Sequence, residues 1–298
     1  MRILIVGLLL VLFMACSSSD KTEEQAFLEG LDTTKVDVTI ISGEIGDILQ
    51  RIPSPLEISV LLKASGKTYN AFLLNSPDNL ANYNSNYKRA LNLGIYGTDL
   101  GYTNIYEQGQ DGLKYMSAIK DLADGLNIGQ FFELETIGRL ASNSNNLDSL
   151  LLITTQNFNS INHYLQNQNR SNLSVLLLTG GWLEALHITC EVAMANPGSK
   201  QLHETIGGQK IILDNIIQLL AFYKEGDRNM ASLLTDMEAL KNAFDKVVIT
   251  STYKESTFEI VDAVMVIKDN SSSTIAITPA DIESIRSATK NIRTKIVS

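Results

Sequence analysis

Apolar residues recur at intervals of three and four along most of the chain, which places them on one face of an α-helix. The pattern is clear over residues 80–105. Pro77 and Asp78 precede this stretch, and both residue types are favoured at helix starts. We therefore predict a long, closely packed helix that begins near Pro77.

Three glycines interrupt the apolar face of this helix. Gly94, Gly97 and Gly101 lie three and four residues apart. A glycine inside a helix costs about 1 kcal/mol relative to alanine. We expect that these positions permit the close approach of a neighbouring element.

Further helices follow from the same spacing. They are predicted at about 110–125, 129–142, 147–168, 171–195, 199–224 and 228–246. Short polar breaks separate them, for example at 143–146 and 196–198. Because short connections favour antiparallel neighbours, the predicted fold class is mostly α, a multi-helix bundle of antiparallel helices.

The period changes near residue 247. Residues 264–267 and 274–277 are rich in β-branched side chains, and the polar stretch 268–273 lies between them. This pattern predicts a small C-terminal β-hairpin with a long polar loop. A last helix is expected after it, with Thr278 at the N-cap and Pro279 in the first turn.

The first residues have the order of parts of a secretion signal. Arg2 is followed by an apolar run over residues 3–13 and by the small pair Ala15-Cys16. The run is shorter than the roughly 20 residues needed to cross a bilayer. We predict that residues 1–15 are a signal peptide that is removed after export.

The cysteine at the predicted cleavage site indicates a more specific kind of signal peptide. Phe13-Met14-Ala15-Cys16 resembles the lipobox of bacterial lipoproteins, although Phe13 stands where leucine is commoner. The resemblance implies that Cys16 carries a lipid and becomes the first residue of the mature protein. Ser17 favours the outer membrane by resemblance to lipoprotein sorting. An ordinary signal peptide that happens to end near a cysteine remains the alternative.

The mature chain is predicted to have two parts. Residues 16–35 are polar and form a tether, and residues 36–298 form one helical domain that ends in the hairpin and the last helix. The second cysteine, Cys190, lies in an apolar segment and is expected to be a small buried hydrophobe, with no disulfide.

The net charge narrows the class of partners. The chain carries −9, and removal of the signal peptide takes away only Arg2 among the charged residues. Nucleic acid and anionic membrane surfaces are disfavoured, since both reward clustered positive charge. The partners that we expect are the membrane, through the lipid, and an envelope protein or glycan.

Glu184 and His187 form the sharpest local motif. Glu-x-x-His is the spacing by which helical bundles hold di-iron or di-manganese pairs. A second such pair is missing, because Ser160 and Lys200 stand three residues before His163 and His203. We therefore expect no metal and no cofactor, and interpret Glu184 and His187 as a buried polar pair, satisfied by each other and by a tyrosine hydroxyl.

Asp99 lies in an apolar, glycine-rich helix where a carboxylate is costly to bury without partners. Asp99, Tyr102 and Glu184 are interpreted either as lining a pocket or as a hydrogen-bond network with Tyr96 or Tyr106, and the network is favoured. Trp182 could likewise line a ligand groove, but more often such a residue fills a core.

Common catalytic patterns are missing from the sequence. Neither the Gly-x-Ser-x-Gly elbow of hydrolases nor the His-Glu-x-x-His zinc motif occurs, and Gly207-Gly208-Gln209-Lys210 lacks the parts of a phosphate loop. Thiol catalysis would rest on Cys190 alone, without the electropositive, partly exposed setting that a reactive thiol needs. No residue is therefore assigned a catalytic role.

A wider resemblance covers roughly residues 40–295. The stretches 93–96, 99–102 and 179–184 are similar to those of a group of uncharacterised helical lipoproteins from Bacteroidetes-type bacteria. The resemblance implies a surface lipoprotein with a helical fold. It brings no reaction or ligand with it.

These observations lead to one expected function and two alternatives. We expect a lipid-anchored, non-enzymatic binding or interaction protein of the cell envelope, in the outer membrane and facing the periplasm or the exterior. The first alternative is an envelope enzyme built around Asp99, Glu184 and His187, which requires that the three side chains converge on one solvent-connected pocket. The second is a structural lipoprotein of a membrane assembly, which requires a large exposed apolar patch.

Overall fold

The computed structural model describes residues 62, 66, 68–133, 147–261, 264–268, 270 and 272–298. The predicted signal peptide, the tether and the start of the domain at residue 36 lie outside these residues. So does residue 134 onward of the helix predicted at 129–142.

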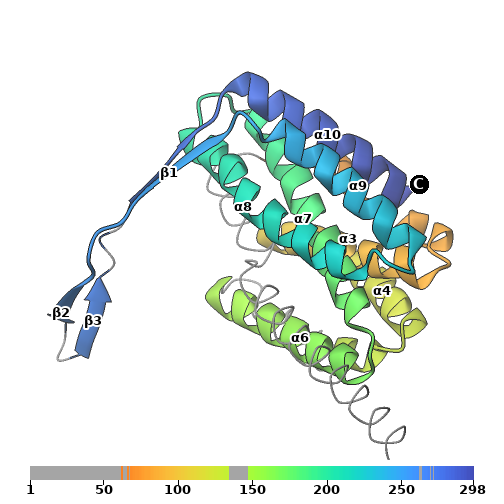
Figure 1. Cartoon of the computed structure of the whole chain (residues 1–298). Coiled ribbons are helices and arrows are strands. Elements are labelled where there is room, and N and C mark those ends of the chain that lie inside the picture. Colours follow the sequence, from red (N-terminus) through yellow and green to blue (C-terminus); the bar gives the residue numbers. More distant parts are fainter. Residues whose placement is uncertain are drawn as a thin grey trace, which may run out of the picture. The chain divides into compact units, whose positions relative to one another are not determined.

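The described residues form a bundle of helices with a small antiparallel β part near the C-terminus, which confirms the predicted fold class (Figure 1). The α-helices are α3 (Asn86–Ile105), α4 (Gly109–Gly125), α6 (Leu147–Asn167), α7 (Ser171–Met194), α8 (Lys200–Tyr223), α9 (Arg228–Ala243) and α10 (Pro279–Val297). Three short 3-10 helices are η1 (Ala71–Leu73), η2 (Pro77–Asn82) and η3 (Gly129–Phe132).

Two predicted helix starts need correction. Pro77 opens the 3-10 helix η2, and the long helix α3 begins only at Asn86. Ser85 explains the later start, because its hydroxyl accepts the Lys88 amide at 3.2 Å and satisfies an unpaired donor of the first turn. The segment that begins at Gly129 is likewise 3-10 helix through Phe132.

Helices α3 and α7 pack more extensively against each other than any other pair of described elements. A Cβ at Gly94 would overlap the backbone carbonyl of Leu177, and a Cβ at Gly180 would overlap that of Leu91. Close approach thus requires glycine from both helices. The expectation was wrong for Gly97, because nothing lies within 4 Å of a Cβ built there.

Helix α7 is the central core helix. It is long and apolar enough to cross a membrane, and it alone is so among the helices in the described part of the chain, yet nearly all of it is buried inside the fold. That combination is typical of a core helix. Cys190 lies on α7, buried and without a disulfide, as predicted.

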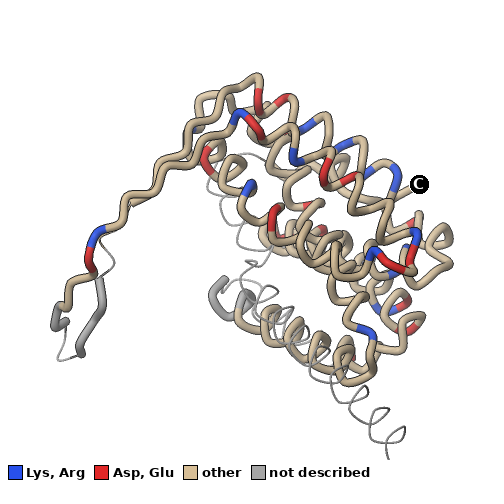
Figure 2. The backbone as a smooth tube through the Cα atoms, viewed as in Figure 1, with Lys and Arg blue, Asp and Glu red and all other residues tan. Residues whose placement is uncertain are grey.

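Helix α10 closes the bundle beside α7 and α9 (Figure 1). It begins with the predicted N-cap: the Thr278 hydroxyl accepts the Asp281 amide at 3.2 Å, while the Asp281 carboxylate accepts the Thr278 amide at 2.9 Å. This capping box fixes the start of the helix. Many of the charged positions lie along α9 and α10, whereas α3 and α7 are largely uncharged (Figure 2).

The β part differs from the predicted hairpin. Its strands are β1 (Val248–Thr252), β2 (Thr257–Val261), β3 (Val264–Lys268) and β4 (Ser272–Ala276). The predicted pairing of 264–267 with 274–277 is wrong, because β3 pairs with β2 and β4 pairs with β1, both antiparallel. The strands therefore form two nested antiparallel pairs, with β2 and β3 lying between β1 and β4 in the sequence.

The β1–β4 pair rests on helix α8. A Cβ at Gly207 would lie 2.5 Å from the Ile275 side chain, so the glycine makes room for this residue of β4. Just before β1, the Lys210 ammonium donates to the carbonyl of Val247 at 2.8 Å. These contacts anchor the base of the strand pair on α8.

Candidate functional site: a buried carboxyl–arginine cluster

Glu184 of α7 and Arg293 of α10 form a two-pronged ion pair in the core. The Arg293 Nε donates to Glu184 Oε2 at 2.5 Å, and its Nη2 donates to Oε1 at 2.6 Å. Glu184 is completely buried, and the Arg293 side chain is only 14% exposed. Because water is largely excluded here, either charge would cost free energy if it lost its partner. The ion pair therefore fixes the position of α7 relative to α10.

Asp99 of α3 places a second carboxyl beside this pair. It is fully buried, and its Oδ2 accepts the backbone amide of Asn75 at 3.1 Å. Its Oδ1 has no hydrogen-bond donor among the described residues. Burial raises the pKa of Asp99 well above its usual range, and the facing Glu184 raises it further against the opposing effect of Arg293. The neutral form of Asp99 is therefore favoured over the charged form.

His187 does not have the role expected of it. Glu184 is paired with Arg293 and not with His187, whose buried Nδ1 lacks a hydrogen-bond partner in the described part of the chain. Burial lowers the pKa of His187, and this effect outweighs the nearby Glu184, which raises it. The imidazole is neutral, so it adds no positive charge to the cluster.

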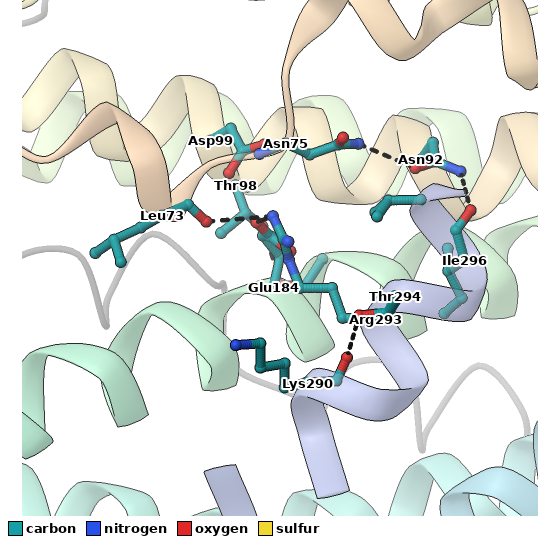
Figure 3. Close-up of polar contacts among 12 residues, drawn as sticks. Leu73, Asn75, Asn92, Thr98, Asp99, Glu184, Lys290, Arg293, Thr294 and Ile296 are labelled. Carbon is teal, nitrogen blue, oxygen red and sulfur yellow. Dashed lines mark hydrogen bonds and ion pairs between the residues drawn. The ribbon is translucent and has the colours of Figure 1, made fainter. Parts of the chain in front are cut away.

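The segment of residues 69–76, here called the strap, covers the cluster. The Arg293 guanidinium donates to the carbonyl of Leu73 at 3.2 Å (Figure 3). The Tyr115 hydroxyl donates to the carbonyl of Asn75 at 3.0 Å, and the Tyr96 hydroxyl donates to that of Ser76 at 2.9 Å. The strap is thus bound through its backbone, by side chains from α3, α4 and α10.

The Asn75 side chain extends the network toward the end of the chain. Its amide donates to the Tyr83 hydroxyl at 3.0 Å and to the Asn92 carbonyl oxygen at 3.2 Å. Asn92 in turn donates to the carbonyl of Ile296 at 3.2 Å, near the last turn of α10 (Figure 3). The two buried asparagine side chains therefore link the strap to Tyr83 and to a backbone carbonyl of α10.

The structure separates the predicted site residues into two groups. Asp99 and Glu184 face each other, whereas Tyr102 contacts the strap, where its hydroxyl accepts the Asn70 amide at 3.3 Å. Trp182 is not part of the cluster, because its indole donates to Gln209 of α8 at 2.8 Å. It is buried and fills the contact between α7 and α8.

The partners predicted for Asp99 need correction. Tyr96 donates to the strap and not to Asp99, and Tyr106 packs in a tilted contact against Tyr102, with ring centroids 4.8 Å apart. The hydroxyl of Tyr106 is buried without a hydrogen-bond partner among the described residues. Asp99 accepts a hydrogen bond from the Asn75 amide, and Glu184 is the carboxyl that faces it.

The burial of these side chains bears on the enzyme hypothesis. Asp99 and Glu184 are 0% exposed and His187 is 6% exposed, so the three side chains that the enzyme hypothesis names are shielded from solvent in the described part of the structure. No group of three or more histidine, cysteine or acidic residues with metal-binding geometry occurs among the described residues. Among the described residues, the cluster joins α3, α7, α10 and the strap.

Arg293 is the residue that sequence reasoning missed. Four residues before it, Thr289 is buried, and so is Ile285 eight residues before it, so helical spacing places Arg293 on the apolar face of α10. A second signal is a matched spacing: Glu184 and Glu191 are seven residues apart, as are Arg286 and Arg293. Glu191 pairs with Arg286 at 2.9 Å, which is the arrangement of two antiparallel helices.

The chain matches no known protein family, and no curated protein or solved structure matches it.

Proposed function

We propose that this protein is a lipid-anchored component of the cell envelope that works by binding another envelope protein, and that the β1–β4 strand pair is its contact surface. The lipid anchor rests on the sequence from Phe13 to Cys16. The binding role rests on one observation in the fold, which is a pair of strands with exposed faces and unpaired edges.

The strand pair is unusual because it has few neighbours. Each of β1 and β4 has one partner strand in the described residues, which leaves an unpaired edge on each. Nearly all of their side chains are exposed, and only Ile249 and Ile275 are half-buried. A two-stranded ribbon of this kind is marginally stable in water by itself.

The edges also lack the features that normally prevent strand pairing. Proteins protect exposed edges with charged side chains or proline. Neither β1 nor β4 contains a charged residue or a proline, and Figure 2 shows both in tan, the colour of residues other than Lys, Arg, Asp and Glu. An uncharged, extended protein segment that adds as a third strand fits this surface.

Exposed aromatic residues follow directly on β1. Tyr253 is 81% exposed, and Phe258 at the start of β2 is 68% exposed. Aromatic side chains of this kind provide most of the binding energy in many interfaces. Together with strand addition, which requires a peptide backbone, they fit a protein partner.

Site-specific photo-crosslinking in intact cells tests this proposal. A photoreactive residue is placed at Thr250 or at Thr274, which are paired across β1 and β4. The matched control is Leu113 on α4, which is 63% exposed and distant in sequence from the strands. We expect one discrete crosslinked protein from both strand positions and none from Leu113.

Two results would contradict the proposal. One is the absence of a product from both strand positions in a chain that is folded and present at normal level. The other is a product with the mass of two copies of this chain, which would replace the partner by a second copy.

A further inference from the structure

The strap over Asp99 differs from every other element that faces the buried carboxyl. Helices α3, α4, α7 and α10 are each at least 17 residues long and packed in the bundle. The strap contains a single 3-10 turn, and its surface includes Phe72, which is 99% exposed. Local opening begins where few apolar contacts hold the chain, so the strap is the weakest part of this enclosure.

Burial and the facing Glu184 disfavour a charged Asp99, and together they outweigh Arg293 and the Asn75 amide, which favour the charge. Glu184 of α7 is already paired with Arg293 of α10, so a charged Asp99 would place two carboxylates beside one guanidinium. The tyrosines nearby are neutral donors: Tyr83, Tyr96 of α3 and Tyr115 of α4. His187 of α7 is neutral as well. Ionised Asp99 therefore needs water, which the closed cluster does not admit.

We propose that the strap is a cover whose opening is controlled by the proton on Asp99: the protonated carboxyl keeps residues 69–76 closed, and its loss opens them. Water reaches Asp99 most easily by displacing Leu74 and Asn75, because the other walls are long helices. The Glu184–Arg293 pair remains in place when the strap lifts, since it joins two helices of the bundle.

The direction of the pH effect follows from the shift at Asp99. The closed state holds the proton more tightly than a hydrated carboxyl does, because burial raises the pKa of Asp99. Closure is therefore fully favoured below about pH 4, the usual range of an aspartate, and weakens as pH rises toward the raised pKa of the closed state. Within this window the open fraction increases tenfold for each pH unit, because one proton is released on opening.

Amide hydrogen exchange read by mass spectrometry tests the proposal on the full mature chain in detergent. Protection factors of peptides covering residues 69–76 are compared with those from the centre of α7 between pH 5 and pH 8, a span of about three units. We expect strap protection to fall up to tenfold per unit while α7 stays protected. Asp99→Asn, which keeps the shape and the hydrogen bonds of the protonated acid, should hold strap protection constant with pH.

A second variant distinguishes an effect of the Asp99 proton from a general weakening of the strap contacts. Tyr115→Phe removes one hydrogen bond to the strap, at the Asn75 carbonyl. It should lower strap protection by the same factor at every pH and leave the slope unchanged. The proposal is overturned if strap protection in the natural chain does not change with pH, if α7 loses protection in parallel, or if the Asp99→Asn chain keeps the slope.

Discussion

Replacing Arg293 by methionine is expected to lower the free energy of unfolding by about 3–5 kcal/mol. The substitution keeps most of the side-chain volume but leaves Glu184 fully buried next to Asp99 with no counter-charge in contact. A buried carboxylate that loses its partner retains the cost of its desolvation. Urea unfolding of both chains, analysed at a common slope, measures the difference.

Arg286→Met is the matched control for this experiment. Arg286 joins the same two helices, through Glu191 of α7, but its side chain is 27% exposed and its partner is 19% exposed. It also contacts Glu283 one turn earlier. Because a half-exposed ion pair contributes about 1 kcal/mol or less, a small loss is expected. Equal losses for the two variants would show that burial of the cluster does not set the cost.

Replacing Gly94 by alanine is expected to destabilise the fold by about 3 kcal/mol, the upper range for an overpacked core. The added methyl group would overlap the backbone carbonyl of Leu177, and a backbone atom cannot rotate away as a side chain does. Helices α3 and α7 would have to separate. Thermal or urea unfolding measures the loss.

For Gly97→Ala on the same helix we expect the opposite result, a gain in stability. Gly97 is exposed, and a Cβ there has no neighbour within 4 Å. Alanine should therefore stabilise the helix by about 0.5–1 kcal/mol through its higher helix propensity. A loss at both positions would contradict the claim that contact with α7 requires glycine at position 94 but not at position 97.

The helical architecture was predictable because each helix carries its own apolar stripe. The bounds of α4, α6, α7 and α8 agree with the predicted ones to within two residues. The start of α3 was missed because Pro77 and Asp78 also suit a 3-10 turn, whereas the hydroxyl of Ser85 caps the α-helix. Local spacing identifies a helix better than it identifies the first residue.

The strand pairing could not be read from the same pattern. Residues 264–268 stand out by their apolar side chains, but β1 and β4 consist largely of serine and threonine. Such strands show little contrast between two faces, because only Ile249 and Ile275 are even partly buried. The apolar pattern therefore did not indicate that β1 pairs with β4 and that β2 pairs with β3.

The candidate site was predictable only in part. A carboxylate in an apolar helix must have partners, which correctly drew attention to Asp99 and Glu184. Their partners are distant in sequence: Arg293 lies 109 residues after Glu184, and Asn75 lies 24 residues before Asp99. His187 was chosen because it is near in sequence, yet tertiary packing brings Arg293 to the carboxylate. Nothing local to Glu184 distinguishes the two.

Membrane attachment through Cys16 is the claim on which the proposed function depends most, and the mass of the N-terminal peptide tests it most directly. The protein is purified from the membrane fraction of bacteria that produce it, beside a Cys16→Ser chain as control. We predict that the peptide begins at Cys16 and carries acyl chains, and that the Cys16→Ser chain carries none. A chain that retains residues 1–15, or that begins at an unmodified Cys16, would contradict the proposal.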